Sequence, residues 1–331
     1  MHIPDNYLSP QTCAVMAAAM VPVWTISIKK IKKEIPKEKL PLMGVAAAFS
    51  FISMMFNVPI PGGTTGHAVG GTLIALLLGP YAACISISVT LLLQALIFGD
   101  GGILSFGANC FNMAFVLPFV GYIIATFINK HLKKNKNGIL GAAIGSYVGI
   151  NAAALCAAIE FGIQPMLFQD AAGKAMYCPY GLNISIPAML GGHLTFFGLA
   201  EVVFTVFVLL FVEKVSPDFK AKIGNREKAK TPLPIRILLA ALIVLTPIGL
   251  LAEGSAWGEW SKDEIAATGV GFTPSGMMSG IHYKALLPDY SIVGLPNWFG
   301  YILSAMIGAA VLVILFKLIS GVHSHKTASA E

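Results

Sequence analysis

Charged side chains are scarce in this chain. Asp, Glu, Lys and Arg make up 11% of its 331 residues, whereas 56% of the residues are hydrophobic, and the mean hydropathy is +0.76. The charges fall in clusters between long apolar runs, whereas a soluble protein of this length would spread them over amphipathic faces. Runs of about 20 apolar residues can cross a bilayer. The pattern therefore excludes an ordinary soluble protein, and the net charge of +6 reflects membrane topology rather than nucleic-acid binding.

Several chemical motifs are also missing. No GxxxxGK[ST] phosphate loop occurs, so the chain cannot bind ATP in that way, and no HExxH or paired-carboxylate pattern points to hydrolysis. The five cysteines form no CxxC pair, and four of them lie in apolar spans, where cysteine packs as a small hydrophobe. No basic segment with a small-residue cleavage site precedes the first apolar run, so we expect no removed signal peptide. We expect neither an enzyme nor a cofactor of its own, and active transport would need energy from partners or from an ion gradient.

Nine apolar spans follow one another along the chain. Their approximate boundaries are residues 9–28, 40–58, 68–79, 81–98, 105–128, 138–159, 185–212, 237–252 and 298–318. The third span is short and follows a glycine-rich stretch, which predicts a broken or partly re-entrant element. The sequence thus predicts an all-α polytopic membrane protein with a seven-helix core and two further helices near the C-terminus.

The distribution of basic residues predicts the orientation of the chain. Segments 29–39, 129–137 and 213–236, together with the tail from residue 317, hold 19 of the 22 Lys and Arg residues. Only Lys174, Lys262 and Lys284 lie in the other connections. Cytoplasmic loops carry the excess of Lys and Arg. We therefore expect the N-terminus outside the cell and the C-terminus in the cytoplasm, which an odd number of spans also requires.

The first two residues form a potential metal chelate. The Met1 amine, the deprotonated Met1–His2 amide and the His2 imidazole can close two fused rings on one ion, and another imidazole would complete a square plane. Four nitrogen ligands in a plane suit Ni(II), Cu(II) or low-spin Co(II), whereas Mg²⁺ and Ca²⁺ prefer oxygen. A bulky residue at position 2 should also prevent removal of Met1. The plainer interpretation is that His2 simply follows the start codon.

A second histidine, His67, ends a stretch in which prolines and glycines prevent a regular helix, residues 57–67. Irregular backbone at membrane depth is tolerated only when it is buried in protein or lines a cavity. We therefore expect an outer cavity with His67 in its wall and the N-terminus folded into it. The polar residues that could support the ligands are Asp5, Gln94, Asn109 and Asn112. The two asparagines are three residues apart, which on a regular helix gives a shared face; interhelical hydrogen bonding is an equally good reading. The acidic residue within FGDGG, Asp100, reads most simply as a turn residue.

At these residues the chain resembles a known family. The segments MHIPDNYLSP, VPIPGGTTGHAVGGTL, LLLQALIFGDGG and FGANCFNMA are similar to the substrate-specific membrane component of energy-coupling-factor cobalt/nickel transporters, called CbiM or NikM. The resemblance implies that Met1, His2 and His67 bind Ni(II) or Co(II) as the transported substrate. It also implies a prokaryotic plasma membrane, a separate transmembrane coupling subunit and two cytoplasmic ATPase subunits. Asn6 stands where the family most often has glycine, which puts only the geometry of that turn in question.

The C-terminal part reads as an appended module. We expect residues 1–213 to form the seven-span metal-binding core, 214–235 a basic cytoplasmic linker, and 236–331 a two-span accessory module with an extracytoplasmic loop. This module resembles the small accessory subunit CbiN or NikN, here fused to the core. The alternative is an inert extension.

Two polar residues in the seventh span leave alternatives open. Glu201 lies eight residues after His193, and an ionisable residue within a membrane span is a functional candidate. Structural hydrogen bonding or coupling to a partner is favoured over a shared metal ion. Two competing functions follow from these residues: an ion-coupled carrier that works alone with Glu201 as its relay, and a membrane metalloenzyme built on His67 and His193. The sequence does not choose between nickel and cobalt, because both accept the same four nitrogens.

Overall fold

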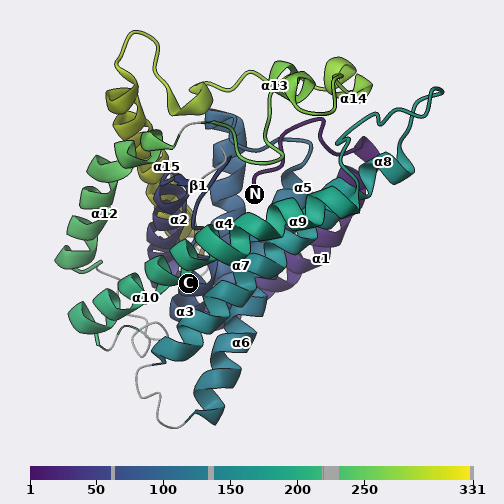
Figure 1. Cartoon of the computed structure of the whole chain (residues 1–331). Coiled ribbons are helices and arrows are strands. Elements are labelled where there is room, and N and C mark those ends of the chain that lie inside the picture. Colours follow the sequence, from purple (N-terminus) through teal and green to yellow (C-terminus); the bar gives the residue numbers. More distant parts are fainter. Residues whose placement is uncertain (61–63, 133–137, 218, 220–230, 253, 329–331) are drawn as a thin grey trace.

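The computed structural model of the chain describes residues 1–60, 64–132, 138–217, 219, 231–252 and 254–328, with side chains up to residue 321. Most of the predicted basic linker, residues 218 and 220–230, lies outside the described residues. The described chain is dominated by helices that pack side by side (Figure 1). Among these described residues, seven helical segments are long and apolar enough to cross a membrane: Pro10–Glu34, Pro80–Phe98, Phe106–His131, Ile139–Leu167, Leu182–Val215, Leu233–Leu251 and Asn297–Gly321. The predicted all-α polytopic membrane fold is confirmed.

Short irregular turns divide several of these segments into separate helices. The helices are α1 (Pro10–Glu34), α4 (Pro80–Leu93), α5 (Phe106–Asn109), α6 (Leu117–His131), α7 (Ile139–Gly162), α8 (Gln164–Leu167), α9 (Leu182–Gly192), α10 (Gly198–Val215), α12 (Leu233–Leu245) and α15 (Asn297–Ala328). Turns of π-helix follow α4 (Gln94–Phe98), α5 (Cys110–Val116) and α9 (His193–Phe197). Such turns within α-helices often mark functional positions, and each of these three contains a polar residue singled out above.

The two remaining predicted spans are shorter helices between α1 and α4. Helix α2 (Leu40–Met54) has 15 residues and α3 (Gly71–Leu78) has 8. Helix α3 is short because glycines with positive φ flank it, at Gly70 (φ 74°) and Gly79 (φ 91°), where residues with a side chain are strained. This is the broken element that the sequence predicted. Between α2 and α3 the chain forms an antiparallel hairpin, β1 (Val58–Ile60) and β2 (Thr64–Gly66), and His67 follows β2 directly.

The start of α1 fixes where the N-terminal segment leaves the bundle. The Ser9 hydroxyl accepts a hydrogen bond from the Thr12 backbone N–H at 3.0 Å, and Pro10 occupies the first helical position. Both are favoured helix-start features. Residues 1–8 therefore turn away from the axis of α1, and Met1, Ile3, Tyr7 and Leu8 are buried in the main apolar core.

The C-terminal helix α15 packs closely against α2. A Cβ atom added at Gly44 would lie 3.0 Å from Phe316 Cβ, and one added at Gly308 would lie 2.3 Å from the Phe51 ring. Small residues on both helices thus allow the close approach that membrane helices use for association. The Tyr301 hydroxyl also donates to the Met55 carbonyl at 3.0 Å. The C-terminal module expected over residues 236–331, called the second module below, is therefore packed into the helix bundle.

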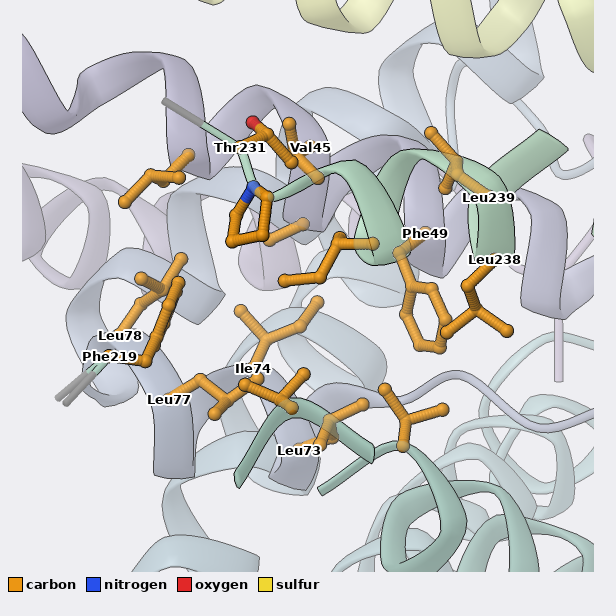
Figure 2. Close-up of a pocket in the computed structure, with 16 residues that line it drawn as sticks. Val45, Phe49, Leu73, Ile74, Leu77, Leu78, Phe219, Thr231, Leu238 and Leu239 are labelled. Atoms are coloured by element: carbon orange, nitrogen blue, oxygen red, sulfur yellow. The ribbon is translucent and has the colours of Figure 1, made fainter. Parts of the chain in front are cut away.

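An apolar cavity of about 70 Å³ separates α12 from the core. Its walls come from α2, α3, α10 and α12 and from the residues that flank the linker (Figure 2). Of the residues labelled there, such as Phe49, Leu73 and Leu238, only Thr231 carries a polar side-chain atom. The cavity has no ligands for a metal ion, so the polar chemistry must lie elsewhere.

The segment between α12 and α15 covers the opposite end of the bundle. It contains two short helices, α13 (Lys262–Ala267) and α14 (Ser275–Ser279), and Figure 1 shows them beside the N-terminal segment. The Tyr7 hydroxyl donates to the Trp260 carbonyl at 2.8 Å, and the Trp257 N–H donates to the Thr64 hydroxyl at 2.9 Å. The segment between α12 and α15 thus contacts both the N-terminal segment and the hairpin before His67.

Candidate metal centre

The N-terminal segment is held in a fixed position by the turn after α4 and by α5. The Ile3 N–H donates to Asn109 Oδ1 at 2.7 Å, and Asn109 Nδ2 donates back to the Ile3 carbonyl at 3.0 Å. The same carbonyl accepts from the Gly102 N–H at 2.9 Å. Asn109 therefore fixes the position of the backbone directly after His2.

Asp5 fastens the segment a little further along. Its carboxylate accepts hydrogen bonds from the backbone N–H groups of Leu104 at 2.7 Å and Ile103 at 3.1 Å. Gly102 makes this approach possible, because a Cβ atom there would lie 2.3 Å from Asp5 Oδ1. Asp5 thus anchors the N-terminal segment through these backbone N–H groups rather than through either histidine.

The fold brings His2 and His67 together. His2 Nδ1 lies 3.2 Å from His67 Nε2, and the ring centroids are 5.0 Å apart. Both side chains are buried, at 2% and 8% exposure. Two nitrogens at neighbouring corners of a square plane, each about 2 Å from a metal ion, lie about 2.8 Å apart. The observed spacing is therefore close to what two such ligands need.

The backbone around His67 is fixed from two sides. On one side, the hydroxyls of Ser50 and Ser53 in α2 donate to the carbonyls of Val69 and Ala68, at 2.8 and 3.1 Å. Burial lowers the pKa of His67 well below its usual value, and the His2 ring and the N-terminal amine lower it further. A neutral imidazole is the form that binds a metal ion.

Glu201 fixes the same segment from the other side. Its carboxylate accepts the N–H groups of Val69 at 2.7 Å and Gly70 at 3.0 Å, at the N-terminus of α3, where a negative charge is favourable. His193 instead places its Nδ1 2.8 Å from the Met189 carbonyl one turn earlier. Both side chains thus bond to backbone groups, and the bonds of Glu201 stabilise the start of α3.

Gln94 and Asn112 have different surroundings. Gln94 Nε2 donates to Asp100 Oδ2 at 3.2 Å and to the Tyr290 hydroxyl at 3.0 Å, so it belongs to the polar network beside His2. Asn112 donates instead to Glu160 Oε2 in α7 at 2.9 Å. The π-helical turn that starts at Cys110 changes the angular spacing of residues. Three residues of separation therefore do not place Asn112 on the site face of Asn109.

Two acidic residues at the site were not identified from the sequence. Asp100 Oδ1 lies 3.2 Å from His2 Nδ1, and Glu259 Oε1 lies 3.1 Å from the Met1 amine. Asp100 had been read as a turn residue, and it does occupy a turn, between Gly99 and Gly101, which both have positive φ. The available signal was its position six residues after Gln94, at the end of the same span and on the side where His2 was expected.

A polar cavity of about 390 Å³ lies between the core and the second module beside these residues. Its walls include both histidines and three carboxylates, those of Asp100, Glu259 and Asp289. Among the described residues, no group of three or more His, Cys, Asp or Glu side chains has a metal-binding arrangement.

Comparisons with known proteins agree with this architecture. Residues 2–219 match the family described as the cobalt uptake substrate-specific transmembrane region (CbiM), and residues 232–324 match the PDGLE domain. The chain is 53% identical to the probable fused nickel transport protein LarMN of Lactiplantibacillus plantarum, over 96% of this chain and 97% of that protein. It is 43% identical to the fused nickel transport protein NikMN of Rhodobacter capsulatus, over 98% of both chains.

A solved structure gives the same result for the fold. A crystal structure of a transition metal transporter is 56% identical, covers 67% of this chain and 98% of its own, and superposes with a TM-score of 0.62. With the family match over the first 219 residues and full-length relatives above 40% identity, the predicted resemblance is confirmed. The chain belongs to the CbiM family of substrate-specific transmembrane components of metal uptake, in a form that carries a fused PDGLE module, and it is a transport component rather than an enzyme.

Proposed function

We propose that this protein captures Ni(II) or Co(II) outside the cell for an ATP-driven importer of the energy-coupling-factor type. The observation that carries the proposal is the buried pair His2 Nδ1 and His67 Nε2, 3.2 Å apart, next to a buried N-terminal amine. The names of the full-length relatives, which are nickel transport proteins, support the metal class.

The orientation of the His2 ring supports the chelate. A six-membered ring that runs from the His2 amide nitrogen through Cα, Cβ and Cγ closes at Nδ1, and Nε2 is too distant to close it. The structure turns Nδ1 toward His67, while His2 Nε2 is buried without a hydrogen-bond partner among the described residues. The four ligands would then be the Met1 amine, the His2 amide, His2 Nδ1 and His67 Nε2.

Metal binding would break contacts that the ligand atoms make in this structure. The protonated Met1 amine donates to Glu259, so this amine must lose a proton and leave the carboxylate before it can bind a metal ion. The amide must also be deprotonated. Metal binding should therefore release protons and become tighter as the pH rises.

The energy for uptake would come from other subunits. The sequence contains no phosphate loop, so we propose that a transmembrane coupling subunit and two cytoplasmic ATPases complete the importer. The proposed orientation, with the N-terminus outside, follows from the 19 of 22 basic residues that cluster on the other side. Glu201 is engaged by backbone N–H groups, which favours a structural role over the relay of an ion-coupled carrier.

The decisive experiment changes the terminal amine while keeping every side chain. One residue inserted before Met1, and retained in the purified protein, should abolish high-affinity nickel binding measured by competition with a chromophoric chelator. His67→Ala should do the same by removing the fourth ligand. His131→Ala is the matched control, because this exposed histidine bonds only to the Phe127 carbonyl among the described residues. Tight binding by the extended protein would refute the terminal chelate.

A further inference from the structure

The first spanning helix of the second module, α12, packs loosely against the rest of the bundle. None of its residues from Leu233 to Leu245 is buried, whereas α15 buries Leu312 and Phe316. The apolar cavity described above lies beside α12, and its walls include Val45 of α2 and Leu239 of α12 (Figure 2). Helix α12 therefore leaves space between itself and α2 that apolar groups can occupy.

A second, larger cavity adjoins the apolar one. Its volume is about 400 Å³, and the two cavities share four lining residues: Val45, Thr231, Ile235 and Leu239. The remaining walls of the larger cavity come from α2, α12 and α15, at Pro41, Arg236, Val313 and Lys317. Its lining thus contains two basic side chains and no acidic one. Together the two cavities place a cationic space next to an apolar one.

The two basic side chains have no protein counterion in the described part of the chain. Both ion pairs found there involve the N-terminal residues, Met1 and His2. Arg236 and Lys317 are exposed, so a ligand can reach them. The first turn of α12 contains no acidic residue and has no side-chain cap, so the partial positive charge of this helix end adds to that of Arg236. The larger cavity therefore carries positive charge that an anion would neutralise.

These basic residues lie where the inner surface of the membrane is expected. Arg236 ends the basic segment 213–236 and Lys317 begins the basic tail, and both regions are proposed to be cytoplasmic. The Ser320 hydroxyl, one turn beyond Lys317, donates to the Lys37 carbonyl at 2.9 Å, so the first basic segment lies at the same end of the bundle. The cytoplasmic leaflet carries anionic phospholipids, and basic pockets between membrane helices on that side bind their headgroups.

We propose that an anionic phospholipid of the inner leaflet binds between α2, α12 and α15. Its phosphate contacts Arg236 and Lys317, and an acyl chain lies along the apolar wall formed by Val45, Ile235 and Leu239. A phospholipid matches both cavities, because it joins an anionic phosphate to an apolar chain. The bound lipid links the loosely packed helix of the second module to the core. The choice of leaflet rests on the proposed orientation of the chain, whereas the site itself is independent of the proposed metal ligands.

The test compares two lipids on the full-length protein, purified in a nonionic detergent and titrated in native mass spectrometry. Phosphatidylglycerol is the anionic probe, and phosphatidylcholine with the same chains is the reference because it has no net charge. Each Lys or Arg near an anionic lipid is worth about a five-fold change in affinity. We therefore expect phosphatidylglycerol to bind about 30-fold more tightly. Combining Arg236→Gln with Lys317→Gln should remove this preference, and each single variant should remove part of it.

The matched control combines Lys32→Gln with Lys130→Gln. It also removes two exposed basic side chains proposed to be cytoplasmic, but neither of them lines the two cavities. The control should keep the full preference for phosphatidylglycerol. Val45→Phe tests the apolar part, because a larger side chain in the wall shared by both cavities should weaken binding of both lipids equally. The melting temperature of each variant in lipid-free detergent shows that the fold is retained.

Three results would overturn the lipid site: equal affinity for the two lipids, an equal loss of preference in the control, or displacement of the lipid by an equal concentration of glycerol phosphate, which lacks the acyl chains. The inference is also wrong if the Arg236 and Lys317 variants bind lipid normally but no longer co-purify with the coupling subunit, because the cavity would then bind protein. None of these results bears on the metal ligands, which nickel binding by His67→Ala tests separately.

Discussion

Removal of the Asn109 side chain should weaken metal binding without touching a ligand. Asn109→Ala deletes both hydrogen bonds to Ile3, at 2.7 and 3.0 Å. The Ile3 carbonyl keeps its bonds from Gly102 and Ser105, but its N–H is left buried without a partner. An unsatisfied buried donor costs about 1–3 kcal/mol and a lost hydrogen bond about 1 kcal/mol. The position of the N-terminal segment should therefore be destabilised by about 2–4 kcal/mol.

This loss of free energy reduces metal affinity by the same amount if the N-terminal segment must hold its observed position to bind metal. Since about 1.4 kcal/mol corresponds to a factor of ten, nickel affinity should fall about 30- to 700-fold. Competition with a chromophoric chelator measures it. Asn112→Ala is the control, because Asn112 bonds to Glu160 in α7 and should lower thermal stability while leaving nickel affinity unchanged. Equal affinity losses in the two variants, or none in Asn109→Ala, would show that the segment is not positioned as described.

Four further outcomes are expected. The metal-free protein should lose stability as the pH falls below about 6.5, because the unfolded His67 then binds a proton that the buried ring resists; His67→Gln should flatten this part of a melting-temperature profile. Glu201→Gln should lower the melting temperature, because an amide has only one oxygen to accept the N–H groups of Val69 and Gly70. Proton flux into proteoliposomes, measured as acidification of their interior, should not change in this variant. Deletion of residues 217–331 should leave a folded core that loads nickel poorly in equilibrium dialysis, with partial rescue by residues 233–331 supplied separately. Finally, the purified chain alone should release no phosphate from ATP in a coupled assay.

The parts of the proposed site that could be predicted from the sequence depend on neighbouring residues or on the expected topology. The proposed chelate of Met1 and His2 would use atoms of two covalently linked residues, so predicting it needs no tertiary information. His67 could be placed on the same side of the membrane because the glycine- and proline-rich break and the basic clusters define topology. Seven of the nine predicted spans correspond to helical segments that, in the described part of the chain, are long and apolar enough to cross a membrane. The short α3 corresponds to the broken element predicted from the glycine-rich stretch before it.

The contacts that escaped prediction join distant parts of the chain. Glu259 reaches the Met1 amine across 258 residues and Tyr290 reaches Asp100 across 190. Periodicity locates helices but does not predict which distant loop covers a given site. Neither Glu259 nor Tyr290 therefore carried a local signal of its contact. Asn112 shows a second limit, because a π-helical turn alters the faces that a regular helix would predict. The contact of Asp100 with His2 could not be predicted, because the neighbouring glycines already accounted for Asp100 as a turn residue.

Asn6 shows how a departure from the family pattern fits this fold. Its φ is 70°, a left-handed conformation in which glycine is favoured and asparagine is the next best tolerated residue. The turn is therefore retained despite the side chain. That side chain then bonds to the second module with both of its polar atoms: Nδ2 donates to the Ile281 carbonyl at 2.8 Å, and Oδ1 accepts from the Ile281 N–H at 3.0 Å. Glycine at this position could make neither bond. In a chain whose module is fused, asparagine thus preserves the turn that points His2 into the site and also ties that turn to the segment that covers it.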